Sequence, residues 1–156
     1  MDEAERLPYV DEHSTVVAAG PNATWGALLH VLEASVSSAA PHLARMLGCA
    51  DVGASGPRPL AVGSAFTGFH VAAAEEPHEL ALAGSHRFSS YALVFRLEDL
   101  GAGRTRLHAE TRAEFPGLKG RAYRALVIGA RGHVLAIRRI LAAVRRRAQK
   151  DGGADG

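Results

Sequence analysis

The stretch that decides the fold is RTRLHAETRAEFPGLKGRAYRALVIGARGHVLAIRRILAAVRRRA, residues 104–148. Its first part, residues 104–115, alternates in polarity, which predicts a β-strand with one dry face and one wet face. Pro116-Gly117 then ends the strand, because proline cannot donate a ladder hydrogen bond and glycine favours turns. From about Leu118 to Ala148, apolar residues recur at every third or fourth position. This spacing predicts one long amphipathic helix.

The predicted helix carries a single apolar stripe, and most of its arginines lie off that stripe. The stripe consists of Tyr123, Leu126, Val127, Ala130, Val134, Ile137, Leu141 and Val144. A helix of about 30 residues is long, because the mean in globular proteins is about 11–12. We therefore expect it to lie across the full width of a sheet and to close the core with its stripe.

Three further strands are predicted before this stretch, where the hydrophobic period is two. They cover residues 65–74, 79–84 and 86–97. The glycine-rich segment 100–103 predicts a hairpin turn into the strand that follows, because glycine supplies the positive φ of tight turns. One face of the strand at 86–97 carries Tyr91, Leu93, Phe95 and Leu97.

The N-terminal part of the chain predicts one more strand and a helix. The segment 13–19 is short and rich in β-branched side chains, which predicts a strand, and Gly20-Pro21 ends that strand. We expect a helix that begins near Ala23, with Asn22 or Thr24 as its N-cap.

The middle of the chain predicts a short second helix and a loop. Residues 42–47 repeat the helical spacing, and Gly48 can cap their C-terminus. Residues 50–63 predict a loop, with one short edge strand at most, around Leu60 and Val62. Strands and helices are therefore segregated along the chain, which favours an α+β fold. A curved antiparallel sheet that curls around a helix often leaves a gap, and such a gap is the usual ligand cavity.

The composition is that of one soluble domain. The chain has 156 residues, of which 47% are hydrophobic and 22% charged. We expect a domain at residues 10–149, a flexible segment at 1–9 and a disordered tail at 150–156. Cys49 is the only cysteine, which excludes an intramolecular disulfide and a cysteine-rich zinc site. The first residues are acidic and contain no apolar run, so we expect no secretory signal and a cytoplasmic location.

The net charge of +2 conceals two oppositely charged parts. Residues 1–116 contain 8 Lys and Arg and 14 Asp and Glu, whereas residues 117–150 contain 10 Lys and Arg and no acid. The basic face of the last helix has three interpretations: a solvated surface, a contact with an anionic membrane, or a nucleic-acid site. We favour the first and place nucleic acid last, because no aromatic residues interleave with the arginines. Glu110 and Glu114 are expected to face solvent.

Three segments resemble the helix-grip superfamily called SRPBCC, which includes START domains, pollen-allergen-like proteins and polyketide cyclase/aromatases. The segments are VVAAGPNATWGALL (16–29), FRLEDLGAGRTRLHAE (95–110) and FPGLKGRAYRALVIGARGH (115–133). The third is similar to an uncharacterised bacterial branch. The resemblance implies an α+β fold, in which a curved antiparallel sheet wraps around a long C-terminal helix and two short helices follow the first strand. Because this superfold includes binders, carriers and enzymes, the resemblance implies no single activity.

The candidate site consists of aromatic, apolar and histidine side chains that can line the gap between sheet and helix. Apolar rings bury a ligand in such a site, and a few polar tips orient it. Gly129 and Gly132, which weaken a helix interior, are expected to border the same cavity. Plain core packing remains the alternative for each residue. The predicted ligand-binding residues are Trp25, Phe69, His86, Tyr91, Phe95, Tyr123, Val127 and His133.

The favoured function is the binding of a small hydrophobic molecule such as a lipid, an aromatic compound or a polyketide. One alternative is a cyclase/aromatase-like enzyme that uses the same cavity, with His86 and Tyr91 as acid–base candidates. Another is an interaction or membrane-surface module that acts through the basic helix. We expect no metal and no cofactor, because the eight histidines are irregularly spaced and no nucleotide-binding loop is present.

Overall fold

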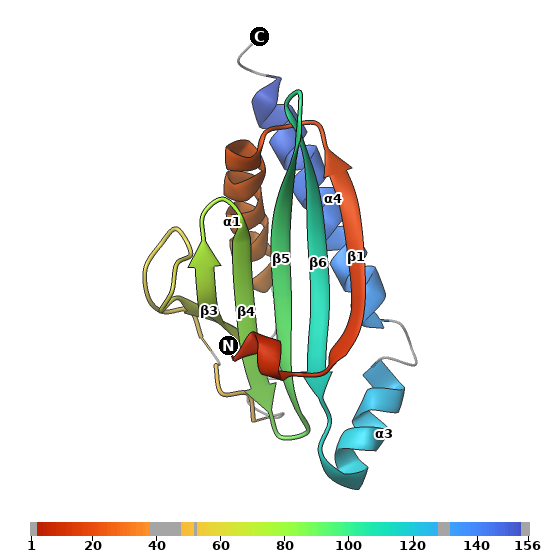
Figure 1. The fold of residues 1–156 in the computed structure, drawn as a ribbon. Coiled ribbons are helices and arrows are strands. Elements are labelled where there is room, and N and C mark those ends of the chain that lie inside the picture. The colour runs from red at the N-terminus through yellow and green to blue at the C-terminus, as the bar shows by residue number, and fades with distance from the viewer. Residues whose placement is uncertain (1–2, 38–47, 52, 128–131, 154–156) are drawn as a thin grey trace.

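The computed structural model of the protein describes residues 3–37, 48–51, 53–127 and 132–153. In this part of the chain, six antiparallel strands form one sheet in the order β1-β6-β5-β4-β3-β2 (Figure 1). The strands are β1 (Tyr9–Val17), β2 (Ala65–Phe66), β3 (Phe69–Glu75), β4 (Glu79–His86), β5 (Ser89–Gly101) and β6 (Arg104–Glu114). The helices are η1 (Ala4–Arg6), α1 (Pro21–Ser37), α3 (Gly117–Val127) and α4 (Gly132–Gly152).

The predicted α+β architecture is confirmed. Helices α1 and α4 pack against each other on one face of the sheet, which we call the inner face. The alternation predicted for residues 104–115 has the expected result, since Leu107 and Ala109 of β6 are fully buried on that face. The apolar side of α4 consists of Ile137, Leu141, Val144 and Ala148, all buried.

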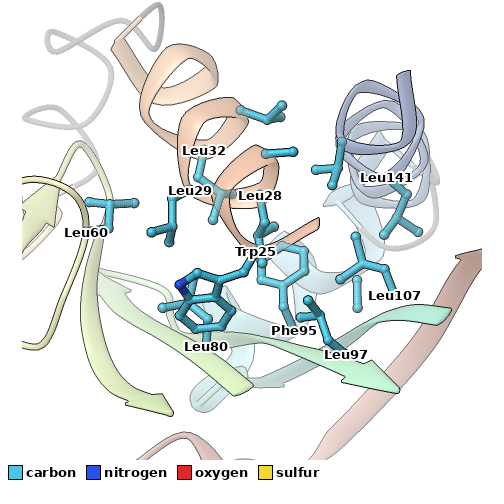
Figure 2. Close-up of a cluster of buried hydrophobic side chains, with 14 of the residues drawn as sticks. Trp25, Leu28, Leu29, Leu32, Leu60, Leu80, Phe95, Leu97, Leu107 and Leu141 are labelled. Carbon is cyan, nitrogen blue, oxygen red and sulfur yellow. The ribbon is translucent and has the colours of Figure 1, made fainter. Parts of the chain in front are cut away.

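Large aliphatic and aromatic side chains fill the space between α1 and the middle of the sheet. Trp25, Leu28 and Leu32 of α1 point toward the strands, where Leu80, Phe95 and Leu107 meet them (Figure 2). Each such side chain contributes roughly 1.5–3 kcal/mol when it is fully buried. This packing seats α1 and α4 on the sheet.

The expectation of one long helix is wrong. Helix α3 ends at Val127, α4 begins at Gly132, and the two helices point in different directions in Figure 1. The physical reason lies in what each helix covers. Tyr123 of α3 contacts aromatic rings at the end of the sheet, whereas Leu141 and Val144 of α4 pack along its length.

The predicted strand at 65–74 is divided. Gly68 has a φ of 87° and forms a turn between β2 and β3. Similarly, the strand predicted at 86–97 begins only at Ser89, because His86 still belongs to β4 and the next two residues turn the chain.

Two further boundaries differ from the predictions. Helix α1 begins at Pro21 rather than near Ala23, because proline is pre-organised for the first position of a helix and needs no N–H partner there. No strand forms around Leu60 and Val62 among the described residues. The short helix predicted at 42–47 lies outside the described residues.

The N-terminal segment, which we expected to be flexible up to residue 9, packs on the outer face of the sheet. Ala4 of η1 is fully buried there against Ala81, Ala92 and Val94. These small side chains leave room for the segment to approach the strands closely. At the other end, α4 continues to Gly152, beyond the predicted start of a disordered tail at residue 150.

Glu110 is buried, contrary to the expectation that it faces solvent. Its carboxylate accepts a hydrogen bond of 2.6 Å from Arg96 Nη1 and another from Arg112 Nε. Arg112 also donates to the carbonyl oxygens of Glu5 and Leu7, so the N-terminal segment covers this cluster. The alternation along β6 identifies the correct face for Glu110 but not the segment that covers it.

We predict that Glu110→Gln destabilises the protein by about 2 kcal/mol at neutral pH. This is below the roughly 3–5 kcal/mol typical of a broken buried ion pair, because Arg96 remains 38% exposed. Burial raises the pKa of Glu110, but the hydrogen bonds from Arg96 and Arg112 outweigh it and hold the pKa below its ordinary value of 4.5. The stabilisation is therefore complete above pH 4.5 and is lost as the pH falls through the folded-state pKa.

The measurement is urea unfolding of both proteins across a pH series. The difference in free energy of unfolding between wild type and Glu110→Gln should shrink below pH 4.5. Glu114→Gln is the matched control, because Glu114 lies on the same strand but is exposed. A difference that stays constant down to the acid transition would contradict this account.

Candidate functional site

Seven aromatic rings converge on the inner face at the end of the sheet near α3. We call them the aromatic cluster. They come from β2, β3, β4, β5, α3 and the connections between elements, and all except Phe66 are half-buried. The members are Phe66, Phe69, His86, Phe88, Tyr91, Phe115 and Tyr123.

The rings contact one another in a continuous path. Phe69 meets Tyr91 edge-on with a centroid distance of 5.1 Å, and Tyr91 lies 5.6 Å from His86. His86 in turn meets Tyr123 edge-on at 4.7 Å, which links the sheet to α3. Tyr123 also stacks on Phe88 with a centroid distance of 5.9 Å. Such geometries are favourable for aromatic pairs, typically by about 0.5–1.5 kcal/mol each.

Tyr91 is held in place by the backbone of two neighbouring segments. Its hydroxyl donates a hydrogen bond of 2.6 Å to the carbonyl oxygen of Gly68. Its ring lies over Gly84, where a Cβ atom would come within 2.6 Å of the ring. Burial, reinforced by the neighbouring Cys49, raises the pKa of Tyr91. The hydroxyl is therefore neutral and engaged, which weakens its candidacy as an acid–base group.

His86 is a neutral ring in this cluster. Burial lowers its pKa below the ordinary value of 6.5. Its Nδ1 atom accepts a hydrogen bond of 3.1 Å from the backbone N–H of Phe88. A neutral imidazole that accepts at Nδ1 carries its proton on Nε2. His86 therefore presents a hydrogen-bond donor within an otherwise apolar set of rings.

A polar cluster lies on the same face, two strands away from Tyr91. It consists of Asp11, His13, Thr111 and His133. His133 Nε2 donates a hydrogen bond of 2.7 Å to Asp11 Oδ2, and His13 Nε2 lies 3.3 Å from the same oxygen. Burial raises the pKa of Asp11, but the bond from His133 and the nearby Thr111 and His13 lower it below its ordinary value. The hydrogen bond between His133 and Asp11 connects β1 to the first turn of α4.

The structure divides the predicted site residues into groups. Phe69, His86, Tyr91 and Tyr123 lie together in the aromatic cluster, and their role in binding stays a prediction. Three further candidates lie elsewhere: Trp25 and Phe95 in the core beside α1, and His133 in the polar cluster. The side chain of Val127 and all of Gly129 lie outside what the structure describes, and Gly132 begins α4.

Sequence reasoning missed several members of both clusters. Phe88 lies between two strands, where period-two alternation assigns no face. The alternation of residues 104–115 placed Phe115 on the face of Leu107 but did not bring it together with Tyr123. Cys49, which lies beside Tyr91 without belonging to either cluster, is in a loop that the hydrogen bond from Ala50 N to Ser85 O brings to the end of β4. Asp11 and Thr111 are far apart in sequence but directly paired across β1 and β6. The expected strand at 13–19 began too late to include Asp11.

Two open grooves flank α4 on its solvent side. One has a volume of about 630 Å³, lies between β1 and α4, and is bordered by Arg138, Arg145 and Arg146. The other has a volume of about 580 Å³, lies between α1 and α4, and is bordered by Arg146, Arg147 and Lys150. Both grooves are therefore strongly basic.

Among the described residues, no group of three or more histidine, cysteine or acidic side chains is arranged to hold a metal ion. The helices described by the structure are also too short or too polar to span a lipid bilayer.

No family model matches the chain, and no curated protein matches its sequence. Solved structures do match. Protein CV1439 from Chromobacterium violaceum aligns with a TM-score of 0.53 at 13% identity, over 91% of this chain and 99% of its own. CalU16 from Micromonospora echinospora aligns with a TM-score of 0.50 at 16% identity, over 92% and 83%. Protein Ms6760 from Mycobacterium smegmatis aligns with a TM-score of 0.50 at 11% identity, over 92% and 96%.

These likenesses show the fold. The chain has the α+β helix-grip fold, as the resemblance in sequence implied. At identities this low, a shared fold does not assign a ligand or an activity. A ligand or partner must therefore be inferred from the two clusters and the basic surface of α4.

We predict that Gly84→Ala destabilises the protein by about 2 kcal/mol, within the range for overpacked cores. The added Cβ would lie 2.1 Å from the Gly68 carbonyl oxygen and 2.6 Å from the Tyr91 ring, so backbone and ring must both move. Urea unfolding measures the effect. Gly26→Ala is the control, because Gly26 lies in α1 with open space around it. That variant should gain about 0.5–1 kcal/mol. Wild-type stability of Gly84→Ala would refute the close packing.

Proposed function

We propose that the protein binds a small, uncharged aromatic or lipid-like molecule on the inner face of the sheet, against the aromatic cluster. One observation carries the proposal: six half-buried rings from strands, loops and α3 converge there, with His86 as a donor among them. Apolar surfaces with a few oriented polar groups are typical of small-molecule sites. Rings that were only core would be expected to be fully buried, as Phe95 is.

The pattern of side-chain size along the inner face supports this location. In the middle of the sheet, Leu80 and Phe95 face each other across β4 and β5 and meet α1. Four residues further along β4, the corresponding row is Gly84, Tyr91 and Ala113. Small side chains at this end leave the space over the sheet to rings that are only partly covered. We therefore place the ligand near α3 rather than beneath the middle of α4.

The proposal is limited to binding. The Tyr91 hydroxyl is engaged by a backbone carbonyl and His86 Nδ1 by a backbone N–H. Neither group is poised to transfer a proton through these atoms. The fold therefore supplies a binding surface with two donors, the Nε2–H of His86 and the hydroxyl of Tyr123.

We also propose that the basic side of α4 contacts an anionic membrane surface. Its exposed cations are Arg138, Arg139, Arg145, Arg146, Arg147 and Lys150. Among the described residues, only Arg147 has an acidic partner, Asp151 at 3.6 Å. The arginines of the sheet differ, because Arg96 and Arg112 are both paired with Glu110. An array of unpaired cations on one helix side complements a negatively charged lipid surface.

Binding to the aromatic cluster can be tested with a fluorescent probe. The neutral probe N-phenyl-1-naphthylamine should bind the wild-type protein, and its lack of charge avoids attraction to the arginines of α4. Tyr123→Ala should weaken binding about tenfold, since one aromatic contact is worth up to about 1.5 kcal/mol. Fluorescence titration measures the dissociation constants.

The control for this titration is Tyr9→Ala, which removes a tyrosine that is 59% exposed on β1. It should leave probe binding unchanged. Native mass spectrometry of the protein as purified adds an independent test for a bound small molecule. Absence of probe binding to the wild type, or equal losses in both variants, would refute the proposed site.

The membrane contact can be tested by co-sedimentation with lipid vesicles. Arg146→Glu should weaken co-sedimentation with vesicles of phosphatidylserine and phosphatidylcholine about tenfold or more. The substitution changes the charge of the side chain from +1 to −1. Each unit of charge contributes about 1 kcal/mol to binding near an anionic surface. Arg104→Glu, at the exposed β5–β6 turn, is the matched control and should bind like the wild type. Equal binding to pure phosphatidylcholine vesicles would exclude an electrostatic contact.

A further inference from the structure

The polar cluster contains three buried atoms without a hydrogen-bond partner among the described residues. They are Asp11 Oδ1, Thr111 Oγ1 and His133 Nδ1. The Thr111 hydroxyl is close enough to lower the pKa of Asp11 but forms no hydrogen bond of normal geometry. Buried polar atoms are nearly always paired in native proteins. Three in one neighbourhood point to a missing partner.

The hydrogen-bonding capacity of these atoms defines what the partner must offer. His133 donates to Asp11 through Nε2, so in the neutral ring Nδ1 is an acceptor. Asp11 Oδ1 is also an acceptor, because a carboxylate has no proton to give. The pKa of Asp11 lies below its ordinary value, so it is ionised at neutral pH. The Thr111 hydroxyl has one proton to donate, and Asp11 Oδ1 and His133 Nδ1 are both acceptors, so one acceptor still lacks a donor. The negative charge of Asp11 disfavours an anion as the missing partner.

The register of the strands places this cluster beside the proposed binding surface. Asp11 is paired with Thr111, Thr111 with Leu93, and Tyr91 lies two residues from Leu93 on the same face of β5. Asp11 thus lies two strands from Tyr91, about 10 Å across the sheet, and the two-residue offset along β5 adds about 7 Å in the strand direction. The separation of about 12 Å matches about three fused aromatic rings with a hydroxyl group.

Both clusters also reach the helices above the sheet. His86 contacts Tyr123 of α3, and Asp11 bonds to His133 of α4. The aromatic and polar clusters therefore flank the same end of the inner face, each tied to an overlying helix. A molecule with an apolar body and a donor group at one edge would satisfy both.

We propose that Asp11, with Thr111 and His133, recognises a hydroxyl donor on an aromatic ligand whose rings lie against the aromatic cluster. The ligand class is a neutral phenol or a fused hydroxyarene. This inference rests on the proposed binding function and adds its polar specificity. In the complex, the ligand hydroxyl donates to Asp11 Oδ1, and the Thr111 hydroxyl and His133 Nδ1 lie beside it.

The test compares two probes of nearly equal shape, 2-naphthol and 2-methoxynaphthalene, by fluorescence titration at neutral pH. Only 2-naphthol can donate a hydrogen bond. Wild type should bind 2-naphthol at least tenfold more tightly, as expected for a hydrogen bond to a charged acceptor. In Asp11→Asn this ratio should fall close to one, while the affinity for 2-methoxynaphthalene stays within about twofold.

Two further variants keep the outcome decisive. Glu12→Gln removes the same charge from the same strand but on the opposite face, where Glu12 pairs with His108, and should preserve the ratio. Thr111→Val keeps the size of the side chain and should also lower the ratio of the two affinities. This variant provides the test if Asp11→Asn fails to fold. Equal binding of both probes to the wild type would overturn this inference and leave the proposed binding site standing. Failure of both probes to bind would refute the binding function itself.

Discussion

The contact between α1 and the middle of the inner face is the interaction on which the rest of the structure depends. Trp25, Leu28 and Leu32 fill the space above Leu80 and Phe95, and α4 packs beside α1. Because this region is filled with large side chains, α1 and α4 are fixed over the middle of the sheet. The end of the sheet near α3 can therefore carry smaller residues and partly covered rings without loss of the fold.

The architecture could be predicted from sequence where one local pattern dominates. Period-two alternation identified β6 and the buried face of β5, because Leu107 and Phe95 face a continuous core. The single long helix could not be excluded in this way, since an apolar stripe continues through both α3 and α4. The two helices differ only in what they cover: Tyr123 reaches the end of the sheet, and Leu141 its middle.

The candidate site was predictable only in part, for a similar reason. His86, Tyr91 and Tyr123 stood out as ring side chains on apolar faces. Asp11 and Thr111 carry no local signal, because their proximity arises from the pairing of the first strand with the last. The structure also shows how the charge difference between residues 1–116 and residues 117–150 is distributed in three dimensions. Arg96, Arg106 and Arg112 of the sheet are paired with nearby acids, whereas most arginines on α4 have no such partner among the described residues.

The pairing of β1 with β6 has a consequence for synthesis of the chain. His133 and Asp11 form a contact across 122 residues, and in the described part of the chain β1 pairs with β6 alone. During translation, the first strand must wait for most of the chain to leave the ribosome before it can pair. Such non-local pairing slows folding. An unpaired, β-branched strand is also exposed to misassociation during that interval. The sheet is thus expected to close only after β6 has been synthesised, rather than strand by strand as the chain emerges.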